Sequence, residues 1–213
     1  MSPRKRTRQG FTLLELMVVI TIIAILAGLT IQAFTFAQQS AARNRTLAAL
    51  TQIKSSLEQY KERYGEYPAP TDAAGSLNTP LGGLNVNYGT AKMLYQAITG
   101  DGNDAINLPQ GTATASSTGN PTVTAMQAGI TQNLPKTMIF SFTDGGSPTY
   151  ILVDGFSHPF QYQKAGVDSN GNNTTVNPNY DLWSYAQTTN GTSNDLTSVQ
   201  SKTQNSNGWL KNW

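Results

Sequence analysis

The sequence contains no cysteine, only one histidine and few charged residues, which make up 12% of its 213 positions. Without cysteine, the chain has no disulfide, no thiolate metal ligand and no cysteine nucleophile. It also lacks a glycine-rich phosphate-binding loop. These absences exclude several classes of enzyme and leave packing, or a bound ion, to hold a folded domain together.

The single histidine lies close in sequence to an aspartate and a serine, the residue types of a catalytic triad. These residues are Asp154, Ser157 and His158. Triad members must converge in space, whereas neighbouring residues on an extended segment point apart. We therefore predict that His158 is structural and that the chain is not an enzyme.

Basic charge is concentrated at the N-terminus. The first ten residues contain no acid and hold four of the 14 basic residues, namely Arg4, Lys5, Arg6 and Arg8. The remaining residues include ten basic and 12 acidic side chains. A nucleic-acid-binding surface needs a basic patch on the folded part, so we predict no nucleic-acid partner.

A long apolar run follows the basic leader. Residues 16–36 are mostly Leu, Ile, Val, Ala, Met and Phe, and as a helix they would span roughly 32 Å, about the thickness of a bilayer core. The basic flank predicts a cytoplasmic N-terminus and export of the rest of the chain. We therefore predict a single membrane-spanning helix.

Two other interpretations of the apolar run remain open. A buried helix of a soluble protein would need a large core around it. A secretory signal peptide usually has an apolar core of only about 7–15 residues, and the one small-residue site beyond this run is Ser40-Ala41-Ala42. Cleavage there would release a soluble binding protein that begins near residue 43.

One acidic residue, Glu15, interrupts the start of the apolar run. A carboxylate at the centre of a membrane helix costs about 2.5–3.5 kcal/mol, and less near an end. The stretch QGFTLLEL, preceded by basic residues, resembles the prepilin signal of type IV pilins and type II secretion pseudopilins. This resemblance implies that prepilin peptidase cuts between Gly10 and Phe11 and that the new N-terminal residue, Phe11, is N-methylated.

Cleavage would also explain the carboxylate of Glu15. The new amine at Phe11 has a reference pKa of about 7.7–8.0 and is largely cationic at neutral pH. It lies four residues from Glu15, and opposite charges attract strongly once water is excluded. We predict that the amine forms an ion pair with Glu15, either within one chain or between neighbouring chains in a filament. The alternative is that the Glu15 side chain only extends to the polar interface of the membrane.

An amphipathic pattern follows the apolar run. Large apolar residues recur at spacings of three or four, as expected for one buried helix face: Leu47, Leu50, Ile53, Leu57, Tyr60 and Tyr64. Gly65 and Pro68 then end the pattern. We predict one helix over residues 11–64, with a membrane half at 11–36 and a stem that extends to residue 65.

The remaining residues, 66–213, predict a globular head. A short helix is expected at 90–99, and strands are expected at 137–142, 149–155, 159–165 and 180–186. The fold class is therefore α+β, with a long N-terminal helix packed on a small antiparallel sheet, and residues of about 70–135 form an inserted loop region. DGFSHPFQY (154–162) and NYDLWSYA (179–186) resemble the head signature of the major pseudopilin.

The resemblance also suggests a metal ion in the head. The major pseudopilin family carries calcium in the loop after its last strand, and the matching positions here are Ser184 and Asp195. The stretch YAQTTNG lacks the acidic residue of the family pattern at this point. A second motif, DSNGNNTT, begins like an EF-hand loop at Asp168 but lacks its glycine and closing glutamate. No cofactor is otherwise required.

The resemblance implies a structural subunit of a type II secretion pseudopilus. Such a subunit sits in the inner membrane with its N-terminus in the cytoplasm and its head in the periplasm. Its partners would be prepilin peptidase, an inner-membrane assembly platform, further copies of itself and other pseudopilins. The alternative is a type IV pilin or minor pilin of a surface filament that serves adhesion, motility or DNA uptake.

Overall fold

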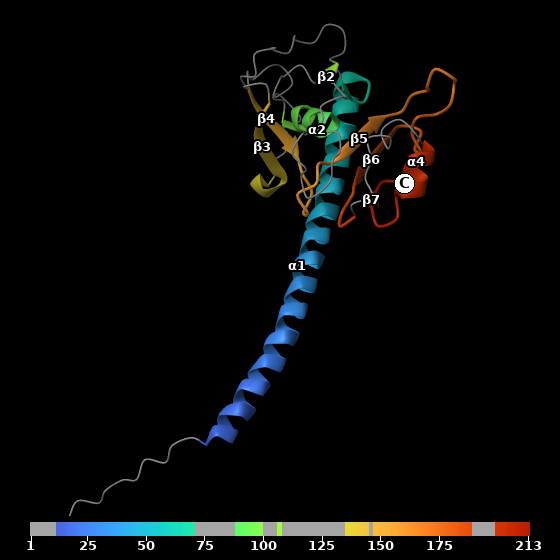
Figure 1. The fold of residues 1–213 in the computed structure, drawn as a ribbon. Helices are drawn as coiled ribbons and strands as arrows, with labels where there is room; N and C mark the ends of the chain where they lie inside the picture. The colour runs from blue at the N-terminus through green and yellow to red at the C-terminus, as the bar shows by residue number, and fades with distance from the viewer. Residues whose placement is uncertain (1–11, 71–87, 100–105, 108–134, 145–146, 189–198) are drawn as a thin grey trace, which may run out of the picture. The chain divides into compact units, whose positions relative to one another are not determined.

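The computed structural model describes residues 12–70, 88–99, 106–107, 135–144, 147–188 and 199–213 (Figure 1). The chain divides into two compact units, Met1–Ala41 and Ala42–Trp213. The first contains a single helical segment, and the second is an α+β head. The predicted fold class is confirmed, and the architecture is pilin-like.

Helix α1 runs over Leu13–Tyr64 and contains 52 residues. Its end matches the prediction. Gly65 takes a φ of 82° and donates its backbone N–H to the carbonyl of Lys61 at 2.8 Å. Glycine adopts this left-handed conformation without steric cost, which makes it a common residue just after a helix.

Within the head, the buried face of α1 differs slightly from the predicted stripe. Ile53, Leu57 and Tyr60 are at most 1% exposed, as expected for core residues. Leu47 is 43% exposed instead, because the neighbouring Thr46 occupies the inward position. The predicted stripe was based on large apolar residues, so it did not include the small buried residues of this face. These residues are Ala42, Thr46, Ala49 and Ser56.

Helix α2 (Gly89–Thr99) confirms the predicted short helix and enters the core. Its residues Met93, Leu94, Ala97 and Ile98 are at most 1% exposed. The helix contacts strands β4 and β5. This part of the 70–135 region therefore belongs to the packed interior, while the low-complexity stretch 111–124 lies outside the described residues.

The strands form three small antiparallel sheets in the described part of the chain, where the sequence predicted one. The short strands β1 (Ala69–Pro70) and β2 (Ile106–Asn107) pair with each other. After the 3-10 helix η1 (Lys136–Met138), β3 (Ile139–Asp144) and β4 (Ser147–Leu152) form the predicted hairpin, with Asp144 opposite Ser147. The third sheet has the order β5-β6-β7.

The third sheet combines two predicted strands with one that the sequence did not reveal. Strands β5 (Gln161–Lys164) and β6 (Tyr180–Ser184) are shorter than expected. Strand β7 (Leu210–Lys211) follows helix α4 (Val199–Asn205) and pairs with β6. Neither α4 nor β7 was predicted, because the polar sequence of this region has no apolar periodicity.

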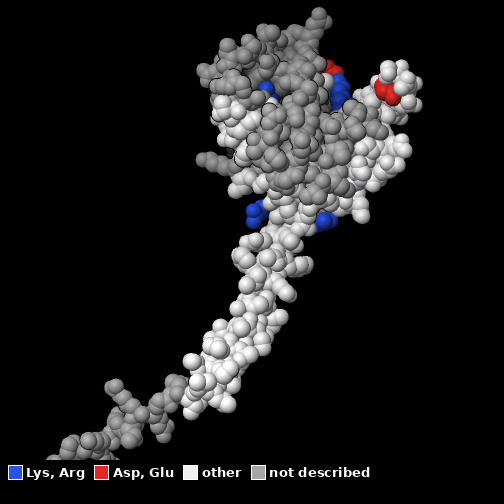
Figure 2. Space-filling view, in the orientation of Figure 1, with Lys and Arg blue, Asp and Glu red and all other residues white. Residues whose placement is uncertain are grey.

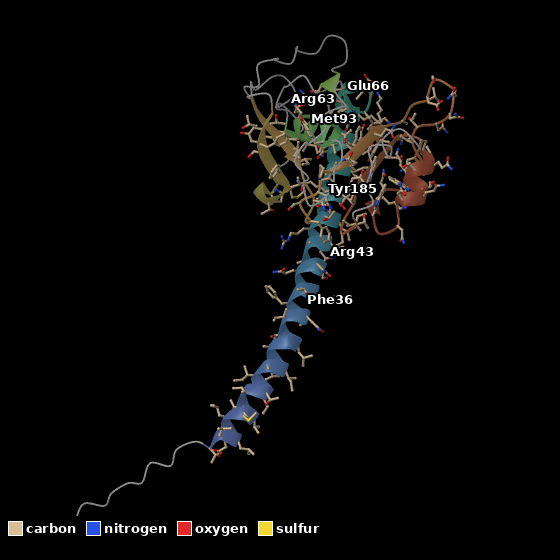
Figure 3. All side chains as sticks on the ribbon, viewed as in Figure 1. Phe36, Arg43, Arg63, Glu66, Met93 and Tyr185 are labelled. Carbon is tan, nitrogen blue, oxygen red and sulfur yellow. The ribbon has the colours of Figure 1, made fainter. Side chains whose placement is uncertain are left out.

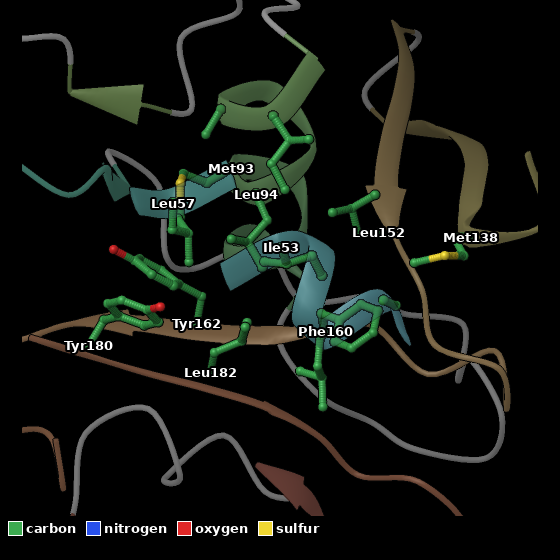
Figure 4. Packing of buried hydrophobic residues seen from close by; sticks show 14 of the residues in the cluster. Ile53, Leu57, Met93, Leu94, Met138, Leu152, Phe160, Tyr162, Tyr180 and Leu182 are labelled. Carbon is green, nitrogen blue, oxygen red and sulfur yellow. The ribbon is translucent and has the colours of Figure 1, made fainter. Parts of the chain in front are cut away.

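The hydrophobic core of the head joins these elements (Figure 4). Ile53 and Leu57 of α1 pack with Met93 and Leu94 of α2, and the strands contribute further core residues, namely Leu152, Tyr162, Tyr180 and Leu182. Several of the aromatic side chains are in direct ring contact; the ring centroids of Tyr67 and Tyr180, for example, are 4.8 Å apart. The amphipathic half of α1 is thus held by the core of the head.

Candidate functional site

The N-terminal half of α1 presents a long, exposed apolar surface. Its large apolar side chains are about half to three-quarters exposed, with values between 49% at Val19 and 76% at Leu13. An 18-residue window of this segment has a mean hydropathy of 2.6 and no part of it is buried. By length and composition, α1 is the one helix among the described residues that could cross a membrane.

Figure 2 shows one face of the same segment. Its visible face carries neither basic nor acidic colour in Figure 2. The labelled side chain of Phe36 projects outward from α1 in Figure 3. A contiguous apolar surface of this size marks a site of contact with lipid or with another protein. We call the segment from Leu13 to Phe36 the apolar segment.

The start of α1 gives Glu15 a local role that the sequence interpretation missed. The backbone N–H of Thr12 donates to Glu15 Oε2 at 2.9 Å, and the backbone N–H of Glu15 donates to Thr12 Oγ1 at 3.3 Å. This reciprocal pair is a capping box, which satisfies two N–H groups at the start of a helix. The spacing Thr-x-x-Glu was the sequence signal that could have revealed it.

The predicted processing site lies just before this cap. Gly10, Phe11 and the leader residues Arg4, Lys5, Arg6 and Arg8 are outside the described residues. Cleavage, methylation and the pairing of Phe11 with Glu15 therefore stay predictions. The structure adds that Glu15 lies in the first turn of α1, where a negative charge is favourable toward the helix dipole.

A second cluster surrounds Asp154 in the loop between β4 and β5. Asp154 Oδ1 accepts the backbone N–H groups of Phe156 and His158, each at 2.8 Å. Ser184 of β6 donates its hydroxyl to Asp154 Oδ2, and His158 Nδ1 lies 3.9 Å from the same oxygen. Burial raises the pKa of Asp154, and the hydrogen bond from Ser184 and the proximity of His158 oppose that shift.

This cluster does not have the geometry of a catalytic triad. The serine that contacts Asp154 is Ser184, and it donates to the carboxylate directly instead of to the imidazole. Asp154, His158 and Ser184 are all at most 4% exposed, so a substrate has no access to them. Ser157, the serine considered from sequence, is exposed.

The Asp154 loop instead packs against the part of α1 that lies within the head. The backbone N–H of Gly155 donates to Thr46 Oγ1 at 3.0 Å. A Cβ atom at Gly155 would lie 2.2 Å from the backbone carbonyl oxygen of Ala42. Only glycine therefore permits this close approach, which gives the DGFSHPFQY motif a structural role.

Of the two residues suggested by sequence as calcium ligands, the structure describes Ser184 only. The Ser184 hydroxyl is fully buried, donates to Asp154 and accepts the backbone N–H of Ala186 at 3.0 Å. Those bonds occupy it with protein partners. Asp195 lies outside the described residues, so the Ser184–Asp195 site stays a prediction. Among the residues that are described, no group of three or more His, Cys, Asp or Glu side chains could hold a metal.

The EF-hand-like stretch forms a turn closed by its own side chains. Asp168 Oδ1 accepts the backbone N–H groups of Asn170 and Asn172 at 2.8 and 2.9 Å. These hydrogen bonds lower the pKa of Asp168, with that from Asn172 having the largest effect. The carboxylate therefore stabilises the turn.

Comparison with known proteins first defines the class of the N-terminal segment. Residues 5–31 match the prokaryotic N-terminal methylation motif. The match spans residues 5–10 of the leader, the predicted cleavage site, Glu15 and most of the apolar segment.

Individual relatives then point to a particular system. The chain is 34% identical over 76 residues to type II secretion system core protein G of Klebsiella michiganensis, which is 36% of this chain and 54% of that protein. It is 33% identical over 70 residues to core protein G of Escherichia coli K12, or 33% and 48% of the two chains. Fimbrial protein EcpC of Eikenella corrodens is 37% identical over 81 residues, or 37% and 51%.

These similarities are partial. The chain spans about half the length of the curated relatives it matches. No solved structure matches it significantly.

Proposed function

We propose that this chain is a structural subunit of a type II secretion pseudopilus. The observation that carries the proposal is the methylation motif at residues 5–31, which overlaps an apolar segment whose most apolar window has no buried part. The relatives named as core protein G support the same system. The protein acts by assembling, has no catalytic residues and requires no cofactor.

Processing prepares the subunit for assembly. Prepilin peptidase cuts after Gly10 and the new terminus at Phe11 is N-methylated. The cut removes the four basic leader residues, which otherwise favour the cytoplasmic face, and creates an amine that pairs with Glu15. The cut thus releases the chain from the cytoplasmic face and supplies a positive partner for the Glu15 carboxylate where water is excluded.

The apolar segment has two successive environments. Before assembly it spans the inner membrane, with the N-terminus in the cytoplasm and the head in the periplasm. After extraction by an inner-membrane assembly platform, it packs against the same segment of neighbouring copies and other pseudopilins. Both environments keep its apolar side chains from water, and the growing periplasmic filament drives the export of proteins.

The experiment that tests this function compares the culture supernatant of the parent strain with that of a strain lacking the chain. Loss of a set of folded proteins from the medium, with accumulation in the periplasm, is the expected result. Complementation with the full chain restores secretion, and complementation with Gly10→Val, which blocks the cut, does not. An unchanged set of secreted proteins contradicts the secretion role.

A second candidate is a type IV pilin or minor pilin of a surface filament. The similarity to fimbrial protein EcpC favours it. The same deletion strain separates the two functions. Loss of surface fibres and of adhesion, motility or DNA uptake, with secretion intact, identifies a pilin.

A further inference from the structure

The C-terminal part of the head contains a completely buried lysine. Lys202 lies on α4 and is 0% exposed, including its side chain. Lysine is almost never fully buried without a partner, because removing an ammonium from water is costly. The surroundings of Lys202 therefore have to replace its hydration shell.

Within the described part of the chain, three oxygen atoms accept hydrogen bonds from the ammonium. The Nζ atom donates to Asp181 Oδ2 at 2.7 Å, to the backbone carbonyl of Thr174 at 3.0 Å, and to Gln163 Oε1. An ammonium has three N–H donors and no acceptor, so three oxygen acceptors match its donors. The ring of Trp183 lies 5.2 Å from Nζ, within the range of a cation–π interaction.

The Asp181 carboxylate also accepts hydrogen bonds from the backbone. Asp181 accepts the backbone N–H groups of Val176 and Asn177 at 2.8 and 2.9 Å. The oxygen set is thus positioned by β5, by the loop before β6, and by β6 itself. Lys202 brings the charge from α4, which is distant in sequence.

The end of the chain packs against β6, the strand that carries Asp181. After α4, strand β7 pairs with β6, and Trp209 stacks on Trp183 with ring centroids 6.0 Å apart. Trp213 also contacts Trp183, at 5.7 Å between centroids. We call residues 199–213 the C-terminal segment.

We infer that Gln163, Thr174 and Asp181 form a cation-binding cage whose occupant is the Lys202 ammonium of the same chain. Carboxylate, amide and backbone carbonyl oxygens are the ligand types that calcium uses. Here a covalently attached ammonium supplies the positive charge and closes the C-terminal segment onto β6. Docking of this segment therefore needs no divalent ion, an inference that does not depend on the proposed function.

The full chain in detergent offers a selective readout for the test. Its three tryptophans are Trp183, Trp209 and Trp213, all in one aromatic cluster. Tryptophan emission during thermal unfolding therefore reports on the C-terminal segment. Lys202→Ala should shift the emission to longer wavelength and lower the melting temperature by about 10 °C, because it leaves Asp181 buried without its partner.

Chemical rescue then identifies the occupant of the cage. Propylammonium contains the atoms that Lys202→Ala removes, so it should restore both the emission and the melting temperature, whereas neutral 1-propanol should not. Lys164→Ala is the matched control, because Lys164 pairs with Glu66 at the surface. An exposed pair contributes little to stability, so this variant should behave like the wild type.

A metal arm provides the decisive contrast. The wild-type melting temperature should be the same in chelator and in excess calcium. A large calcium-dependent increase would overturn the inference and favour the Ser184–Asp195 site. Wild-type behaviour of Lys202→Ala would also overturn it. If that variant does not accumulate, the wild-type chelator and calcium comparison still decides the question.

Discussion

Ile23 and Ile53 lie on the same helix, yet Ile23 is 59% exposed and Ile53 is 0% exposed. The apolar segment displays its side chains, whereas the part of α1 within the head buries one face among α2 and the strands. Side-chain chemistry is the same in the two regions. The head therefore supplies apolar partners for its part of α1, while the apolar segment has to obtain them from lipid or from other chains.

Glycine illustrates the same contrast. Gly28 has no atom within 4 Å of the position that a Cβ would occupy, whereas Gly155 has a backbone oxygen at 2.2 Å. The first glycine is free of steric demand within the chain, and the second is required by packing. Substitutions in the apolar segment are therefore expected to affect contacts between molecules. Substitutions in the head are expected to affect contacts within one molecule.

The largest expected effect is an alkaline loss of head stability. Burial, reinforced by the hydrogen bond to Glu58, raises the pKa of Tyr67 to about 12. Burial also raises the pKa of Tyr60, Tyr162 and Tyr180. Because the unfolded tyrosines ionise near pH 10 and the folded ones do not, stability is complete below that pH and falls as the pH rises toward the folded pKa values.

For a fully buried tyrosine such as Tyr162, each pH unit in that range costs about 1.4 kcal/mol. The apolar segment contains no tyrosine, so its helix should persist while the head unfolds. Near-ultraviolet and far-ultraviolet circular dichroism of the full chain, followed above pH 9, separates the two regions. Ionisation of all nine tyrosines near pH 10 in the folded chain would contradict this prediction.

The second effect comes from paired isoleucine substitutions. Ile53→Ala should lower the free energy of unfolding of the head by about 2–5 kcal/mol, because it leaves a cavity in the core. Ile23→Ala should leave head unfolding unchanged and instead reduce filament yield. Thermal unfolding in detergent and filament recovery from cells measure the two outcomes. Equal effects of both substitutions on head unfolding would contradict this prediction.

The glycine pair should give a somewhat smaller difference. Gly155→Ala should destabilise the head by about 1–3 kcal/mol, since the backbone near Ala42 has to move. Gly28→Ala should strengthen the local helix by about 1 kcal/mol. Unfolding of the head measures the first change, and helix content by circular dichroism measures the second. A neutral Gly155→Ala would show that the Asp154 loop moves away from α1 easily.

The smallest effect on stability, but a clear effect on assembly, is expected at Glu15. Glu15→Ala loses both the capping box and the charge, whereas Glu15→Gln keeps a capping side chain and loses only the charge. Both variants should insert and be cut after Gly10, as N-terminal sequencing would check. If charge pairing matters, both should assemble poorly beside wild-type subunits. Normal filament yield from Glu15→Gln would assign the role of Glu15 to capping.

Features with a short sequence range could be predicted, as particular residues show. The apolar run, the end of α1 at Gly65 and the pairing of β3 with β4 all follow from local composition and spacing. The pattern failed at Leu47, because small residues share the buried face with large ones. The Thr12–Glu15 capping box was also a local signal, but the functional interpretation of Glu15 obscured it.

The apolar helix and its prepilin-like start could be predicted from the amino-acid sequence, because those properties depend on residues that are close together in the chain. Three contacts became apparent only in the folded head: Ser184 with Asp154, Thr46 with Gly155, and Lys202 with Asp181. Each of these contacts joins residues far apart in sequence. Their formation depends on the burial of a whole core, which no local pattern of residues encodes.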